Sequence, residues 1–163
     1  WSSDVCSSDL LGLVNAALTW DAVDRLRKAT KMKVVLKGIV TREDAALARE
    51  HGADGVIVSN HGGRAEESGR GTIECLPEVL EGAASMPVMI DGGFRRGTDI
   101  YKALALGARA AGVGRPYVWG LSAFGQAGVE KVLNMLQAEL AMTMRQLGTP
   151  TIRSITKNAI IHA

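Results

Sequence analysis

The segment Val56-Ile57-Val58-Ser59-Asn60-His61-Gly62-Gly63-Arg64 joins an apolar, β-branched run to a polar, glycine-rich turn. The turn carries a histidine and an arginine three residues apart, which is typical of a catalytic loop at the end of a strand in an α/β protein. Similar strand ends with glycine and arginine follow at 87–97 and 111–116. We therefore expect one site that several successive loops build together.

Strands and helices are predicted to alternate on both sides of this segment. Thr19 and Thr41 are expected to cap the first two helices through their side chains. Short apolar runs predict strands at 34–36, 55–59, 88–90 and 110–113, and helical periodicity predicts helices at 21–28, 45–50, 73–84, 98–106 and about 128–146. Residues 151–163 have no clear period.

This order of elements predicts the fold class. Strands that alternate with helices of this length indicate parallel βαβ units, so we expect an α/β fold with about four βα units. The strands lack the polar alternation of a half-exposed sheet, which predicts that both sheet faces are covered. Four units correspond to half of a (β/α)8 barrel or to a small open sheet, and periodicity alone does not choose between them.

The composition sets limits on the class of protein. Of the 163 residues, 47% are hydrophobic and 22% are charged, which predicts a folded core. The net charge of +2 is too small to indicate nucleic acid or an acidic membrane as a partner. No apolar run approaches the roughly 20 residues that span a bilayer. Cys6 and Cys75 form no metal-ligand spacing or disulfide framework, which favours a cytoplasmic location.

The first ten residues repeat Ser-Ser-Asp and follow neither a helical nor a strand period. They also lack the charged start and apolar centre of a signal peptide. We expect residues 1–10 to be a non-native tail, with a native disordered tail as the alternative, and residues 11–163 to form the domain. On the first interpretation the chain is a fragment of a longer protein.

His61 and Arg64 are the leading candidates for catalysis and substrate binding. A histidine just beyond a strand is well placed to act as a general base, because imidazole titrates near neutral pH. The alternative is a loop histidine that hydrogen-bonds a backbone carbonyl. Arg64 is suited to a carboxylate, which a guanidinium binds with two parallel hydrogen bonds. Its alternative is a surface ion pair with Glu66 or Glu67.

Cations and glycines at the other strand ends predict an anion site. Asp91-Gly92-Gly93 with Arg95, and Gly114 with Arg115, are suited to cradle a phosphate between backbone N–H groups and guanidinium groups. Lys37 follows a strand directly, where its ammonium can stabilise an electron-rich ring or a phosphate; the alternative is a strand-end lysine that reaches solvent. The fingerprint G-x-G-x-x-G is missing, which argues against a Rossmann dinucleotide site.

Together these motifs resemble the FMN-dependent α-hydroxy acid oxidases and dehydrogenases, a family that includes glycolate oxidase, lactate oxidase and mandelate dehydrogenase. The resemblance runs from about Leu18 to the C-terminus and is most specific at 36–38, 59–64, 91–99, 102–108 and 114–116. It implies the C-terminal half of a (β/α)8 barrel, with FMN as the cofactor. It also implies oxidation of a small L-2-hydroxy acid to a 2-oxo acid, followed by electron transfer to oxygen or another acceptor.

The resemblance also implies a role for each matching residue. His61 would be the active-site base, in a hydride or a carbanion route, and would bind the substrate together with Arg64. Lys37 would contact the pyrimidine end of the flavin, and Ser59 would also touch FMN. The ribityl chain and the phosphate would lie among Asp91, Gly92, Gly93, Phe94, Arg95, Gly114 and Arg115. No metal ion is implied, and full-length members of the family are often homo-oligomers.

Two alternatives to this function stay open. An FMN-dependent isopentenyl diphosphate isomerase has similar Asp-Gly-Gly and Ala-Leu-Ala-Leu-Gly-Ala segments but lacks the loop at 60–64. A non-catalytic flavin- or phosphate-binding half-barrel is the other. Because half a barrel leaves two strand edges unpaired, we expect the isolated chain to bind FMN weakly or not at all and to turn over poorly.

Overall fold

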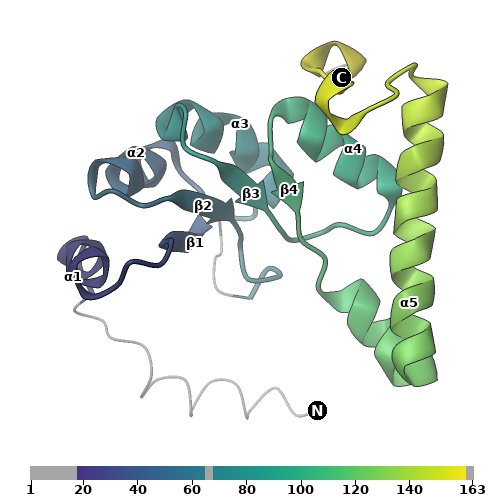
Figure 1. Ribbon diagram of the computed structural model, residues 1–163, viewed down its shortest axis with the longest axis horizontal. Helices are drawn as coiled ribbons and strands as arrows, with labels where there is room; N and C mark the ends of the chain where they lie inside the picture. The colour runs from purple at the N-terminus through teal and green to yellow at the C-terminus, as the bar shows by residue number, and fades with distance from the viewer. Residues whose placement is uncertain (1–17, 65–67, 161–163) are drawn as a thin grey trace.

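The computed structural model describes residues 18–64 and 68–160, so the predicted tail at 1–10 lies outside the described residues. Its centre is a parallel four-stranded sheet in which the strands follow chain order, β1-β2-β3-β4 (Figure 1). The strands are β1 (Val35–Ile39), β2 (Gly55–Val58), β3 (Val88–Ile90) and β4 (Ala110–Ala111).

Helices connect and flank these strands. They are α1 (Asp21–Ala29), α2 (Arg42–Glu50), α3 (Thr72–Ala83), α4 (Gly97–Leu106) and α5 (Arg115–Gln146). The α helix after each of the first three strands returns the chain to the next parallel strand. This sequential order is that of consecutive barrel units, whereas a doubly wound sheet reverses its order at a switch point. The predicted α/β class with four parallel βα units is confirmed.

The largest departure from the predicted boundaries is at β4 and α5. The strand expected at 110–113 spans only Ala110–Ala111, and α5 begins at Arg115 instead of near residue 128. Pro116 lies in the first turn of α5, where a missing N–H costs nothing. The helix is then kinked at Phe124 and Gly125, whose backbone angles are not helical. This kink breaks the apolar period and hides the first part of the helix from pattern analysis.

The two predicted caps have different outcomes. The Thr41 hydroxyl accepts a hydrogen bond from the Asp44 N–H at 3.2 Å, which confirms it as the cap of α2. The expected side-chain cap at Thr19 is wrong, because Trp20 occupies the N-cap position of α1. Thr19 instead accepts the Ala22 N–H through its carbonyl at 2.9 Å.

The core lies between the sheet and helices α2, α3 and α4, which lie on one side of it (Figure 1). The following strand and α3 side chains are each 1% exposed or less: Val56, Val58, Val88, Ile90, Leu76 and Val79. The prediction of a sheet covered on both faces is wrong at β1. Burial alternates along this strand and Val35 is 39% exposed, because Val35 shares with Lys37 the face opposite the helices, whereas Leu36 packs against the core.

The end of the chain packs α5 against α4. The Glu139 carboxylate of α5 accepts the Gly97 N–H at 2.8 Å and the Arg96 guanidinium at 3.0 Å, so it satisfies a free donor at the start of α4. Two short 3₁₀ turns follow, Ile152–Ser154 and Lys157–Ala159, in the region without a clear sequence period. No helix in the described part of the chain combines the length and apolar character that a bilayer crossing requires.

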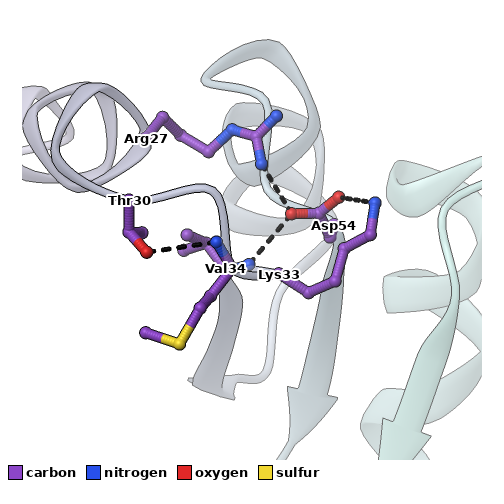
Figure 2. A network of polar contacts seen from close by, with 6 residues as sticks. Arg27, Thr30, Lys33, Val34 and Asp54 are labelled. Atoms are coloured by element: carbon purple, nitrogen blue, oxygen red, sulfur yellow. Dashed lines mark hydrogen bonds and ion pairs between the residues drawn. The ribbon is translucent and has the colours of Figure 1, made fainter.

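Asp54 ties α1 and the start of β1 to the turn before β2 (Figure 2). Its carboxylate accepts hydrogen bonds from Arg27 at 2.7 Å, from Lys33 at 2.8 Å and from the backbone N–H of Val34 at 2.9 Å. The bonds from Lys33 and Val34 are the main causes that lower the pKa of Asp54 from its ordinary value. The carboxylate therefore stabilises the fold in its charged form.

We expect Asp54→Asn to lower the urea midpoint of unfolding at neutral pH, because the amide loses the charge that holds both cations. Because the pKa of Asp54 is lower in the folded state than in the unfolded state, the charged carboxylate stabilises the fold at pH values above the unfolded-state pKa. This stabilisation is lost as the pH falls through the folded-state pKa. The difference between the two proteins should therefore shrink as the pH falls below about 4. Glu50→Gln, at an exposed carboxylate 3.9 Å from Arg49, is the control and should leave the midpoint unchanged. A pH-independent effect of Asp54→Asn would contradict this assignment.

Candidate active site

A cavity of about 610 Å³ opens at the carboxyl ends of the strands, where parallel α/β proteins place their sites. This volume lies within the roughly 300–1,000 Å³ typical of small-molecule and cofactor pockets. Every predicted site residue except Ser59 lines it: Lys37, His61, Arg64, Asp91, Gly92, Gly93, Phe94, Arg95, Gly114 and Arg115. The strand ends thus converge on one cavity, as expected, and the functional roles of these residues stay predictions.

Four cationic side chains and one carboxylate among these residues give the cavity a positive potential. Lys37, Arg64, Arg95 and Arg115 are the cations, and Asp91 is the carboxylate. A cleft that carries one dominant sign of charge raises the local concentration of ligands of the opposite sign. The cavity is therefore suited to anions such as carboxylates and phosphates.

Lys37, Ser59 and Asp91 form a hydrogen-bonded group across three neighbouring strands. The Lys37 ammonium donates to Ser59 Oγ at 2.7 Å and lies 3.3 Å from Asp91 Oδ2. Ser59 Oγ donates in turn to Asp91 Oδ1 at 2.6 Å. The Lys37 and Asp91 side chains are 42% and 27% exposed, whereas Ser59 is 1% exposed. Ser59 thus lies beneath the cavity instead of on its surface.

His61 has a left-handed backbone conformation, with φ of 54°, which is uncommon for a residue other than glycine. Its N–H donates to Ser59 Oγ at 3.2 Å. Its ring lies against the end of β1, because a Cβ built on Gly38 would be 3.0 Å from His61 Cε1. Backbone strain of this kind is often found where a functional side chain is held in place.

We expect Gly38→Ala to move the His61 ring as well as to destabilise the protein. Gly38 has φ of +99°, so a side chain there is strained by about 1–3 kcal/mol, and its methyl group would also push the imidazole. The NMR signal of the His61 Cε1 proton should therefore shift. Gly148→Ala is the matched control, since Gly148 has φ of +66° and an open space at its Cβ position. Gly148→Ala should destabilise the protein without shifting the His61 signal. If the signal also stays in place in Gly38→Ala, the contact between residue 38 and the His61 ring is refuted.

The turn that carries His61 is closed by Asn60. The Asn60 carbonyl accepts from the Gly63 N–H at 2.9 Å and from the Arg64 N–H at 3.3 Å, and its side-chain oxygen also accepts from Gly63 at 3.0 Å. This turn directs Arg64 to the cavity. Within residues 18–64 and 68–160, no hydrogen bond or ion pair engages the Arg64 guanidinium; Glu66 and Glu67, its predicted alternative partners, lie outside the described residues.

The glycine turns after β3 and β4 leave room for an anion. Cβ positions built on Gly93 and Gly114 meet no atom within 4 Å, so the backbone there is open to close approach by a ligand. The Arg95 guanidinium lies 4.9 Å from the ring centre of Trp119, a cation–π arrangement. Arg115 donates to the Gly62 carbonyl. Backbone and side-chain donors at this position fit the phosphate of FMN.

Sequence reasoning missed several contributors to the site. Asn60, Gly62, Gly63, Gly112 and Val113 also line the cavity. Each of them lies next to a predicted residue or within the same motif, and this proximity in sequence is the signal that could have identified them. Trp119 is 55% exposed and contacts the Arg95 guanidinium, which the sequence did not indicate. Phe94 lines the cavity but is only 4% exposed, and its side chain belongs to the hydrophobic core.

The chain is similar in sequence to known hydroxy acid oxidases. The chain is 49% identical to a peroxisomal (S)-2-hydroxyacid oxidase of Arabidopsis thaliana over 90% of this chain and 40% of that protein. It is 45% identical to glycolate oxidase of Spinacia oleracea, over 94% of this chain and 42% of that protein. The chain thus spans about two fifths of the length of these relatives.

A solved structure extends this likeness to three dimensions. A soluble mutant of the membrane-associated (S)-mandelate dehydrogenase from Pseudomonas putida matches with a TM-score of 0.84 and 40% identity, over 93% of this chain and 44% of that one. The match places the four βα units as half of a (β/α)8 barrel, as predicted. The model of the FMN-dependent dehydrogenase family matches residues 4–162, and its description confirms FMN as the cofactor of the family. This chain therefore belongs to the FMN-dependent dehydrogenase family.

Proposed function

We propose that this chain carries the catalytic base and the anion-binding loops of an FMN-dependent oxidoreductase that converts a small L-2-hydroxy acid to a 2-oxo acid. The observation that supports it most directly is that His61 and Arg64 line the same cavity as Lys37 and the glycine turns. A base, a carboxylate-binding cation and a phosphate cradle thus face one space. The named relatives are hydroxy acid oxidases, which agrees with this proposal.

The substrate is held and deprotonated by the loop after β2. Arg64 binds the substrate carboxylate through two parallel hydrogen bonds, for which its guanidinium is free of other described partners. This fixes the 2-hydroxyl carbon near His61, whose imidazole takes a proton from the substrate. The substrate loses two protons and two electrons in total, and its C–O single bond becomes a carbonyl. Bound FMN supplies the two-electron acceptor in this reaction.

The cofactor is held by residues on the other strand ends. Lys37 provides a positive charge near the ring, where negative charge accumulates on reduction. Asp91, Gly92, Gly93, the backbone of Phe94, Arg95, Gly114 and Arg115 surround the ribityl chain and the phosphate. We assign residues 11–163 to one domain and regard residues 1–10 as a tail outside it.

The proposal extends to partners and location. The second substrate would be an electron acceptor, either oxygen or another. We expect the full-length protein to form a homo-oligomer and to be cytoplasmic, although the Arabidopsis relative is peroxisomal.

The direct test is flavin reduction under anaerobic conditions. The full-length protein that contains this sequence, loaded with FMN, should lose the visible absorbance of oxidised flavin when glycolate, lactate or mandelate is added. 2-Hydroxyisobutyrate is the matched control, because it has the carboxylate and the hydroxyl but no hydrogen on the reacting carbon. Equal bleaching by this control, or none with any of the three acids, would refute the proposal.

A further inference from the structure

Arg95 is held in place by three contacts within the protein. The Asp99 carboxylate accepts the Arg95 backbone N–H at 2.9 Å, and the Arg95 guanidinium donates to the Phe94 carbonyl at 3.1 Å. The Trp119 ring lies against the guanidinium, with 4.9 Å between Arg95 Cζ and the centre of the ring. This distance is within the roughly 6 Å that a cation–π interaction allows. One face and one N–H of the guanidinium are thus engaged.

The other donors of Arg95 stay available for a ligand. A guanidinium carries five N–H groups in one plane, and two parallel N–H groups bind a phosphate well. A ring against one face blocks none of them, because they point outward within that plane. Arg95 lines the cavity, whereas Trp119 is not among the residues that line it. The indole therefore contacts the cation without taking up the space of a ligand.

The first part of α5 fixes the position of Trp119. Trp119 lies about one helical turn after Arg115, which donates to the Gly62 carbonyl. Beyond Trp119 the two parts of the kinked helix touch, since a Cβ built on Gly120 would be 2.5 Å from the Gly128 carbonyl oxygen. Only glycine allows backbones to approach this closely. The indole is thus exposed, but the backbone that carries it is closely packed.

We propose that Trp119 is a positioning residue that orients Arg95 toward the phosphate of FMN. An arginine side chain loses rotational freedom when it binds an anion, and this loss weakens binding. The ring restricts the guanidinium before the ligand arrives, so less freedom is lost on binding. The inference rests on the proposed phosphate cradle and adds to it a residue that does not touch the phosphate.

The test compares FMN with riboflavin, which has the same ring system and ribityl chain but no phosphate. Each is titrated into the flavin-free form of the full-length protein that contains this sequence, and the change in flavin fluorescence gives the Kd. Trp119→Leu should raise the Kd of FMN about two- to fivefold, the usual contribution of an exposed cation–π pair. It should leave the Kd of riboflavin unchanged, whereas a general loss of structure would raise both values.

Three further variants separate the aromatic ring from the bulk of the side chain. Trp119→Phe keeps a ring and should retain most of the preference for FMN. Trp119→Met has bulk but no ring and should lose the preference as leucine does, so the test does not depend on the folding of one variant. Tyr117→Leu is the control: Tyr117 is 41% exposed on the same helix but lies about 200° around it from Trp119, and its replacement should change neither Kd.

Arg95→Ala distinguishes this inference from the proposed function. It should raise the Kd of FMN at least about tenfold, and Trp119→Leu should add nothing in this background, because the ring has lost its cation. A lost preference for FMN in Arg95→Ala but not in Trp119→Leu, or additive effects of the two, would overturn the role of Trp119 and leave the cradle in place. An unchanged preference in Arg95→Ala would overturn both.

Discussion

Replacing His61 with glutamine is expected to slow anaerobic flavin reduction by a 2-hydroxy acid by a factor of about 10² to 10⁴, the usual contribution of a general base. Glutamine keeps a polar group on the left-handed turn but cannot accept a substrate proton at neutral pH. The change corresponds to about 3–5 kcal/mol of transition-state stabilisation. The measurement is the decay of oxidised-flavin absorbance after the full-length protein, loaded with FMN, is rapidly mixed with the acid.

His51→Gln is the control for this prediction. The His51 ring lies at the end of α2, 3.1 Å from the Asp24 carboxylate and stacked on Trp20, and it does not line the cavity. We expect its replacement to leave the reduction rate unchanged. An equal loss of rate in both variants would point to a general loss of structure, and an unchanged rate in His61→Gln would remove His61 from the role of base.

Replacing Gly97 with alanine is expected to lower the free energy of unfolding by about 3 kcal/mol, at the upper end of overpacking effects. A Cβ at Gly97 would overlap the backbone nitrogen of Leu140 and lie 2.5 Å from the Glu139 carbonyl carbon. Backbone atoms cannot turn away as a side chain can, so α5 must shift along α4. The shift would also weaken the hydrogen bond from the Gly97 N–H to Glu139.

Urea unfolding followed by circular dichroism measures this change. Thr98→Ala, one residue further along the same helix but exposed, is the control and should change stability by no more than about 0.5 kcal/mol. If Gly97→Ala and Thr98→Ala have the same stability, the close contact between α4 and α5 is not formed in solution.

Much of the fold could be predicted because it depends on local chemistry. The β-branched run at 56–58 favours a strand wherever it lies, and Thr41 caps its helix with an atom three residues from its partner. The start of α5 could not be predicted, because Gly125 interrupts the period within one continuous element. The exposure of Val35 was also hidden, since what covers each face of a strand depends on the packing of the whole fold and not on the strand itself.

For the site, the sequence by itself determined which chemical groups are present and that they follow strands. A parallel sheet places all such loops at one edge, so His61, Arg64, Lys37 and the glycine turns had to converge. Only the tertiary structure decided which groups face the cavity and which lie beneath it. Ser59 and His61 are two residues apart in one motif, yet the turn, in which His61 takes a left-handed conformation, leaves Ser59 within the protein and places His61 at the cavity. Burial and hydrogen-bond partners depend on contacts across strands, and these exist only once the sheet is formed.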